Sequence, residues 1–306
     1  MEFRRGHLLY FVTVAEEGQI TRAAKKLHLA QPALSQAIAQ LESDLGLALL
    51  DRHARGVSLT PAGAVFLQKA RTAVEAWTDA LATAQSLARA RQGRIEFGFV
   101  GSPPGLDSPG PLEAFAAVHP HIDLRYRELP FPTEPTSAWL AGVDLAGCSL
   151  PPADPEVWTY DLRSEDRIVL VPTRHSLAGR ETLTVEEILD ETFIGLHPLV
   201  APSWAGFWSL DDHRGGPPAK VTSDQAAKPQ EVLAALAVRD AITTVPATVA
   251  RIVMSFPTGV LAIPLLGASP VQIVLAGRID RRSALVDALL AFADTGIRLA
   301  PAAAGA

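Results

Sequence analysis

The side chains best suited to chemistry lie near the start of the chain, in a segment rich in glutamine and serine. On a helix, the face opposite its leucines would carry amides, hydroxyls and small apolar groups, whereas an ordinary solvated helix carries Glu and Lys pairs. In the major groove of DNA, Gln can pair with adenine, Ser can bond to more than one base, and a small apolar group can contact the thymine methyl. This face consists of Gln31, Pro32, Ser35, Gln36, Ala39, Gln40 and Ser43. We expect it to contact base edges, although the helix taken alone would also fit a solvated surface.

Basic side chains on both sides of this segment can bind phosphate groups. Residues 1–94 hold 12 Lys and Arg against 8 Asp and Glu, whereas the remainder holds 15 against 25. A net positive charge on residues 1–94 and a net negative charge on the remainder indicate that only residues 1–94 contact a polyanion. The candidate phosphate anchors, which set register without reading sequence, are Arg22, Lys25, Lys26, Arg52 and Arg55. Arg55 lies in a predicted turn and could instead enter the minor groove.

Three short helices are expected to position these side chains. Apolar residues at helical spacing predict a helix over 4–16, which Gly18 ends, and a shorter one over about 20–27. The third helix has Pro32 in its first turn, where proline is tolerated, and ends at Gly46. Its inward stripe consists of Leu34, Ile38, Leu41 and Leu45.

A long helix follows two short strands that surround a turn at Arg55 and Gly56. Thr60 is suited to cap this helix and Pro61 to begin it, and we expect it to extend to about Arg91. A narrow apolar stripe with heptad spacing follows it, and on a linking helix such a stripe more often faces a second copy than a broad core. The stripe consists of Leu67, Ala70, Val74, Trp77, Leu81, Ala84 and Ala88. We predict homodimerisation through its bulky members, Leu67, Val74, Trp77 and Leu81.

Beyond Gly93, short apolar strands alternate with helical segments, which predicts an α/β architecture with largely parallel sheets. No run of 18 apolar residues occurs, so we expect no transmembrane helix. The apolar run near the N-terminus is interrupted by Glu16 and Glu17, which argues against a signal peptide. A single cysteine, Cys148, excludes an internal disulfide and favours a reducing, cytoplasmic setting.

Sequence motifs for catalysis are lacking. The sequence contains no GxSxG, HExxH, P-loop or GxGxxG pattern. Its 8 histidines are scattered, and we expect His119 and His121 at the surface rather than at a metal. Cys148 is expected to pack as a small apolar side chain rather than act as a redox sensor. We therefore expect neither an enzyme nor a bound metal or cofactor.

The segment 11–63 resembles the winged helix-turn-helix of LysR-type transcriptional regulators. The residues that match the family pattern are Ala23, Ala24, Leu27, Gln31, Pro32, Ala33, Ser35, Ile38, Leu41, Glu42, Leu45, Gly46, Arg52, Arg55, Leu59, Thr60, Ala62 and Gly63. Residues 94 to about 300 resemble the family's effector domain more loosely, in the short segments GFVGS, GVDLA and HSLAG. The resemblance thus covers nearly the whole chain.

Several positions depart from the family pattern. Gln19 and Ala30 stand where the family usually has serines that cap the second and third helices. Gln36 replaces a residue that is often Arg in relatives. Arg239 and Ala241 replace glycines of the effector domain, so a description of the ligand pocket copied from relatives would not hold on that side.

The resemblance implies an α/β protein with an N-terminal winged helix-turn-helix, a long dimerisation linker helix and a two-subdomain effector domain similar to periplasmic binding proteins. The implied domains are 1–60 for DNA binding, 61–92 for the linker and 93–306 for effector binding. Within the last, subdomain I comprises about 93–162 and 266–300, and subdomain II about 163–265.

Small ligands in such folds bind in the cleft between the lobes. The residue that stands at the position of Ser102 contacts the effector in relatives, although Ser102 could also serve only as a helix cap. The other candidates across the cleft are Thr133, Thr136, Leu196, His197, Ser203, Trp204 and the loop 222–225. We expect the effector to be a small molecule, a carboxylate or an aromatic compound.

These observations predict a cytoplasmic LysR-type regulator whose binding to promoter DNA is modulated by a small-molecule effector. The implied partners are double-stranded promoter DNA, the effector, further copies of the chain in a homodimer or homotetramer, and RNA polymerase, with no membrane. The alternative is a solute-binding or sensor protein with two α/β lobes whose helical head serves assembly only. An enzyme built from two lobes would need an acid/base cluster in the cleft, which the sequence does not reveal.

Overall fold

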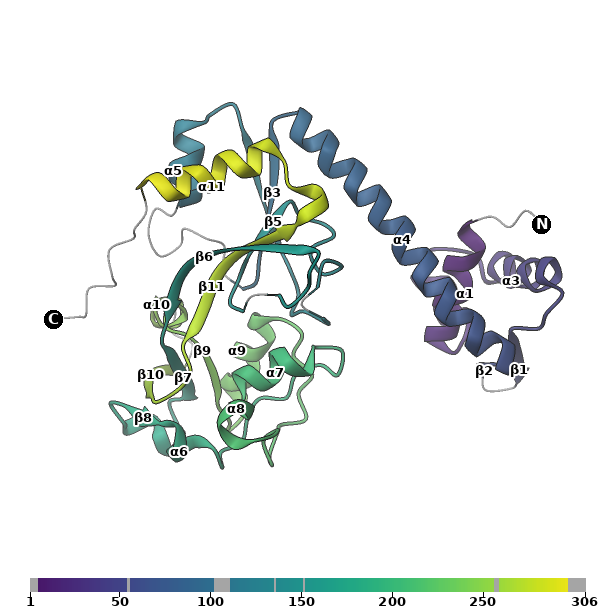
Figure 1. Ribbon diagram of the computed structural model, residues 1–306. Coiled ribbons are helices and arrows are strands. Elements are labelled where there is room, and N and C mark those ends of the chain that lie inside the picture. The colour runs from purple at the N-terminus through teal and green to yellow at the C-terminus, as the bar shows by residue number, and fades with distance from the viewer. Residues whose placement is uncertain are drawn as a thin grey trace. The chain divides into compact units, whose positions relative to one another are not determined.

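Figure 1 shows the computed structural model of the chain, which describes residues 5–53, 56–101, 111–134, 136–150, 152–255 and 259–296. The chain divides into two compact units, Met1–Ala82 and Thr83–Ala306. The long helix α4 (Pro61–Arg91) contributes its first part to one unit and its last part to the other. Among the described residues, no helix combines the length and the apolar character needed to span a membrane.

The N-terminal unit, where the structure describes it, is built from three helices, a two-stranded wing and the start of α4. The elements are α1 (Arg5–Glu17), α2 (Ile20–Lys26), α3 (Gln31–Leu45), β1 (Leu50–His53) and β2 (Gly56–Leu59), with β1 and β2 antiparallel. The inward face expected for α3 is confirmed, since Leu34, Ile38 and Leu41 are fully buried in the core of the unit. Gly18 and Gly46 follow α1 and α3 with positive φ, a conformation that glycine adopts without steric cost.

The start of α4 is held against the backbone that precedes β1. The Thr60 hydroxyl accepts a hydrogen bond from the Gly63 N–H (2.9 Å) and donates one to the Ala48 carbonyl (2.8 Å). The expected cap by Thr60 is therefore confirmed. A Cβ at Gly63 would lie 2.0 Å from the Leu49 carbonyl oxygen, so glycine allows the helix an approach that no other residue permits.

The narrow apolar stripe of α4 is divided between two environments. Leu67, expected at a dimer interface, is instead buried in the core of its own unit, because α4 begins against the three-helix core. This assignment is corrected, since a residue buried in this way has no surface to offer a second copy. Val74 is half-buried against the same core, whereas Trp77 and Leu81 are 45% and 44% exposed.

The described residues of the C-terminal unit form two sheets. The five-stranded sheet has the order β4-β3-β5-β11-β6, formed by β3 (Arg94–Phe99), β4 (Asp123–Glu128), β5 (Leu145–Cys148), β6 (Val157–Glu165) and β11 (Val271–Arg278). The four-stranded sheet has the order β8-β10-β7-β9, formed by β7 (Arg167–Pro172), β8 (Leu183–Thr184), β9 (Thr243–Pro246) and β10 (Val260–Leu266). Each sheet belongs to one lobe of the unit.

Both sheets are mixed, so the expectation of largely parallel sheets is wrong. In the five-stranded sheet, β3 is parallel to β4 and β5, but β11 is antiparallel to β5 and β6. In the four-stranded sheet, β8 is parallel to β10, but β7 is antiparallel to β9 and β10. The reason is that β6 leads directly into β7 and β10 leads directly into β11. These two runs pass between the sheets in opposite directions and therefore pair antiparallel in each; β6 and β11 lie side by side in Figure 1. The crossings lie at Asp166 and between Leu266 and Val271, slightly beyond the expected bounds at 162/163 and 265/266.

Helices pack on the sheets and contribute part of the core, together with the strands. On the five-stranded sheet, α5 (Pro111–Val118) and α11 (Ala284–Gly296) bury Phe115 and Val286. The remaining helices are α6 (Val185–Ile188), α7 (Pro202–Trp208), α8 (Asp211–Arg214), α9 (Pro229–Val238), α10 (Val249–Ser255) and the 3-10 turns Ser176–Gly179 and Ile279–Arg281. The segment 136–142 forms successive turns, for example with the Trp139 N–H bonded to the Thr136 carbonyl.

The last turns of α4 are joined to the five-stranded lobe through a buried carboxylate. Asp144 is 4% exposed and accepts hydrogen bonds from the Ser86 hydroxyl (2.6 Å), the Arg89 guanidinium (2.8 and 3.2 Å) and the Glu96 N–H (2.8 Å). A second buried charge, Arg281, donates to the Thr83 hydroxyl (3.2 Å) and to the Ala141 carbonyl. The end of α4 is thus an integral part of the C-terminal unit.

Candidate nucleic-acid interface

The polar face of α3 is presented to solvent. Gln31, Pro32, Gln36 and Gln40 are exposed, and Ser35 is half-buried at the edge of the same face. The face is outward because the leucine and isoleucine stripe on the other side of α3 is buried in the core. The groups that we expected to meet base edges are therefore accessible together on one helix, with their hydrogen-bonding capacity directed away from the core.

The starts of α2 and α3 carry no side-chain cap. Gln19 precedes α2 and Ala30 precedes α3, both with extended backbone and without a capping hydrogen bond from their side chains. Pro32 lies in the first turn of α3, as expected, where its missing N–H matters little. The departure from the family's serines thus has the local consequence that the sequence predicts.

A hydrogen bond joins the wing to α3. The Arg52 guanidinium on β1 donates to the Ser35 hydroxyl (3.1 Å), so an arginine expected to anchor phosphate lies directly beside a predicted base reader. Both side chains belong to the same surface of the N-terminal unit, where a duplex could contact them together. Arg55, the other wing arginine, lies outside the described residues.

The basic residues of α2 are tied to the end of α1. Lys26 pairs with the Glu17 carboxylate (2.9 Å), and its hydrogen bond lowers the pKa of Glu17. The Arg22 guanidinium donates to the Glu17 backbone carbonyl, whereas Lys25 is exposed. Solvent-exposed pairs of this kind contribute little stability, so phosphate groups can compete for these cations. Arg22, Lys25 and Lys26 thus remain candidates for phosphate contacts.

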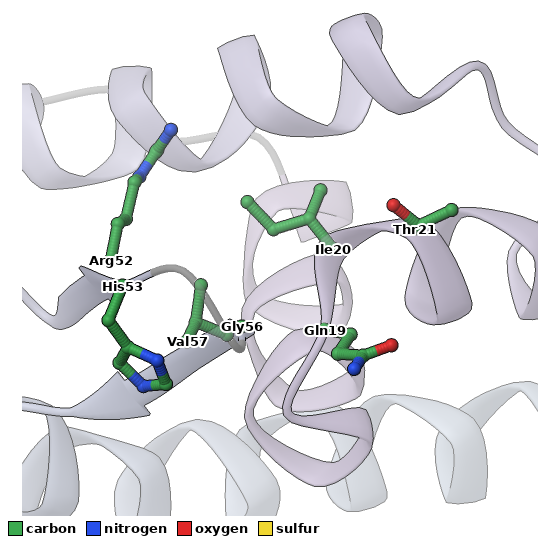
Figure 2. Close-up of a pocket in the computed structure, with 7 residues that line it drawn as sticks. All are labelled: Gln19, Ile20, Thr21, Arg52, His53, Gly56 and Val57. Carbon is green, nitrogen blue, oxygen red and sulfur yellow. The ribbon is translucent and has the colours of Figure 1, made fainter.

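A hollow of about 330 Å³ separates the start of α2 from the wing, and Figure 2 shows the side chains around it. It is lined by Gln19, Ile20, Thr21, Arg52, His53, Gly56 and Val57. The wing is held here by the Val57 N–H, which donates to the Gly18 carbonyl (2.9 Å). A Cβ at Gly56 would lie 2.3 Å from that carbonyl oxygen, so the close approach requires glycine.

The candidate effector residues of the C-terminal unit lie in different environments. Thr133 and Ser203 are exposed, and the segments that hold them are joined by the Ala201 N–H, which donates to the Pro132 carbonyl (2.8 Å). Thr136 is half-buried in the turns that follow. Ser102 lies outside the described residues. The structure therefore brings together the segments of Thr133 and Ser203.

Trp204 belongs to an aromatic cluster rather than to an open surface. Its ring lies 4.5 Å from the ring of Phe131 and 5.7 Å from that of Trp208. Phe131 is 7% exposed and its N–H donates to the Ala227 carbonyl (3.0 Å), which fixes this segment against the loop before α9. Phe131 was not among the residues predicted for this site, and only its apolar type beside Pro130 and Pro132 indicated a buried residue.

The two positions that replace family glycines have distinct roles. Arg239 forms an ion pair with Asp224 of the loop 222–225, at 3.0 and 3.3 Å, and this hydrogen bond lowers the pKa of Asp224. Ala241 is fully buried in the core. Arg239 thus connects the end of α9 to the loop 222–225, a predicted effector contact.

Cys148 ends β5 and is 5% exposed. Burial raises the pKa of its thiol to about 12, which keeps it protonated and unreactive at neutral pH. Within the described residues, no group of three or more His, Cys, Asp or Glu side chains could hold a metal ion.

Both units of the chain match known protein families. Residues 6–64 match the family described as bacterial regulatory helix-turn-helix protein, lysR family, and residues 88–297 match the LysR substrate binding domain. The chain therefore belongs to the LysR family. The family and fold class predicted from the sequence are confirmed, and the proteins of this family that it matches are transcriptional regulators rather than enzymes.

Several curated relatives are similar over different shares of their length. The HTH-type transcriptional regulator AlsR of Bacillus subtilis is 33% identical over 63% of this chain and 64% of its own length, slightly less than two thirds. The HTH-type transcriptional regulator TfdS of Cupriavidus pinatubonensis is 31% identical over 82% of this chain and 84% of its own. XapR of Escherichia coli is 30% identical over 88% and 90%.

Solved structures of full-length regulators have the same architecture. A crystal structure of full-length CbnR complexed with its target DNA is 27% identical, covers 96% of this chain and 99% of its own, and has a TM-score of 0.50. Full-length BenM is also 27% identical, covers 95% of each chain and has a TM-score of 0.52. The likeness thus extends over both units of the chain.

Proposed function

We propose that the chain is a transcriptional regulator that binds promoter DNA through α3 and the wing and responds to a small molecule in its C-terminal unit. The observation that carries this proposal is the exposed amide and hydroxyl face of α3, held beside a wing arginine on a unit that matches the LysR helix-turn-helix. A solvated helix has no need of such a face, whereas base edges in the major groove supply partners for every group on it.

The proposed roles follow from the position of each side chain. The base readers are Gln31, Pro32, Ser35, Gln36 and Gln40, and the phosphate anchors are Arg22, Arg52 and Arg55. We propose DNA binding by residues 1–60, pairing through the linker 61–92 and effector binding by 93–306. Ser102, Thr133, Thr136, Ser203 and Trp204 remain the proposed effector contacts, with a carboxylate or an aromatic compound as the ligand. A regulator of this kind works in the cytoplasm, where promoter DNA and RNA polymerase are its partners.

Replacing Gln36 with alanine is expected to lower the affinity for the specific site by about 1–3 kcal/mol, because one side-chain contact to a base is lost. The measurement is a gel shift of the full chain with its own upstream DNA over a series of salt concentrations. Selective binding with a steep fall in affinity as salt rises supports the regulator, since phosphate contacts release counterions. The matched control is Gln68→Ala, an exposed glutamine on α4, which should leave selectivity unchanged. An absence of selectivity in the unaltered chain would favour the solute-binding alternative.

Introducing charge into the exposed part of the α4 stripe is expected to separate the subunits of the proposed homodimer. Trp77 and Leu81 are nearly half exposed on the helix, and Trp77→Glu with Leu81→Glu would place two carboxylates where an apolar contact is proposed. Analytical ultracentrifugation of the double variant should show a monomer at concentrations where the unaltered chain is dimeric. Gln68→Glu with Thr72→Glu places the same two charges, also four residues apart, on exposed positions outside the stripe and serves as the control. A Trp77 and Leu81 double variant that remained dimeric would exclude this part of α4 from the interface.

A further inference from the structure

The amide of Gln40 is held by a neighbour that has no assigned role. Asp44 lies one turn after Gln40 on α3, and the Gln40 Nε2 donates to the Asp44 Oδ1 (2.8 Å). Residues four apart lie on the same side of a helix, and Gln with Asp at this spacing forms a stabilising pair. Neither residue belongs to the core, since Gln40 is exposed and Asp44 half-buried at the edge of the polar face.

The chemistry of the pair determines which end of the amide is tied. An ionised carboxylate only accepts hydrogen bonds, so the atom of Gln40 that faces Asp44 must be the amide nitrogen. The carbonyl oxygen is bonded to the same carbon on the other side and therefore points away from Asp44. A free glutamine can rotate its amide and offer either a donor or an acceptor, whereas Gln40 in this pair offers mainly its oxygen.

We propose that Asp44 is a positioning residue that makes Gln40 present its carbonyl oxygen to DNA and so select a base with an amino group. This inference rests on the proposed function, because it assigns a base preference to one reader of that interface. In the major groove, adenine N6 and cytosine N4 are donors, whereas guanine O6 and thymine O4 are acceptors that an oxygen would face unfavourably. Gln40 therefore discriminates amino bases from keto bases on the strand that it contacts.

A second effect of Asp44 must be separated from this one. Its negative charge repels phosphate groups, so its removal raises affinity for all DNA sequences alike. Positioning instead changes the ranking of bases at one position and leaves the others unaltered. The two effects are distinguished by measuring every base pair of the site rather than the affinity for one duplex.

The DNA site is first located as the segment that the unaltered protein protects from nuclease cleavage. The test then measures the affinity of the full chain for duplexes of this site in which each base pair is substituted in turn. We expect the unaltered chain to prefer an amino base about tenfold at one position of each half-site, the magnitude of one hydrogen bond. In Asp44→Ala this preference should fall to about twofold, because the amide is free to rotate. In Asp44→Lys it should reverse toward keto bases, since an ammonium group only donates and would turn the amide oxygen away from DNA.

Two controls assign the effect to Gln40. In the Gln40→Ala background, neither substitution at Asp44 should change the base ranking, although both should still raise affinity uniformly. Asp51→Lys alters an exposed charge on β1 and should change affinity without changing the ranking. Lysine and alanine favour helix more than aspartate does, and circular dichroism should show that α3 is retained.

Three outcomes would overturn the proposal in different ways. An unchanged base ranking in Asp44→Ala and Asp44→Lys, with a lost preference in Gln40→Ala, would remove the role of Asp44 and leave Gln40 as a reader. An unchanged ranking in Gln40→Ala, with selective binding retained, would remove both residues from base reading. An unaltered chain without selective binding would overturn the proposed function itself.

Discussion

Asp144→Ala is expected to destabilise the C-terminal unit by about 3–5 kcal/mol, the range observed when one partner of a buried ion pair is removed. Asp144 is 4% exposed and accepts four hydrogen bonds, two of them from the Arg89 guanidinium. Without the carboxylate, the Arg89 charge, the Ser86 hydroxyl and the Glu96 N–H lose their partner in a region that water reaches poorly. Each unsatisfied buried group adds its own desolvation penalty.

The free energy of unfolding is measured by urea denaturation of the full chain, followed by tryptophan fluorescence. Four of the five lie in the C-terminal unit, so the fluorescence change reports mainly on that unit. Asp190→Ala removes an exposed carboxylate from the same unit and should change the free energy of unfolding by less than about 0.5 kcal/mol. An equal, small effect of both substitutions would show that the end of α4 does not depend on Asp144.

Gly63→Ala is expected to destabilise the N-terminal unit by about 3 kcal/mol or more, and to abolish DNA binding with it. The added Cβ would lie 2.0 Å from the Leu49 carbonyl oxygen and 2.9 Å from the carbonyl carbon, both backbone atoms. A flexible side chain could move aside, but this backbone leads into β1 and is anchored by the Glu42 carboxylate, which accepts from the N–H groups of Leu49 (2.7 Å) and Leu50 (3.0 Å). The start of α4 would have to shift away from the core.

Hydrogen exchange of the α1–α3 amides in the full chain measures this effect separately from the C-terminal unit. Gly46→Ala is the matched control, because Gly46 has a φ of 66° and nothing lies within 4 Å of its Cβ position. It should cost about 1 kcal/mol, the penalty for a left-handed conformation without a clash. If the α1–α3 amides exchanged equally fast in the Gly63→Ala and Gly46→Ala variants, the clash predicted at Gly63 would have no effect on stability beyond that of a left-handed residue.

Local patterns in the sequence were sufficient to predict the helices of the N-terminal unit and their ends. The apolar stripe of α3, the glycines after α1 and α3, and the Thr60 cap each follow from residue types at short, fixed spacings along the chain. Such interactions have a fixed period or a fixed spacing, so they can be read from the order of residues alone. The polar face of α3 was predictable for the same reason, because burial of one side of a helix exposes the other.

Contacts between distant segments were decided only by the tertiary structure. The direction of β11 against β5 and β6, the burial of Leu67, and the place of Phe131 beside Trp204 depend on where the chain returns after many residues. The same holds for the Arg52–Ser35 bond and for Asp144, whose partners lie 48 to 58 residues away. A residue's type specifies which partner it needs, but only the folded chain determines which of the available partners is within reach.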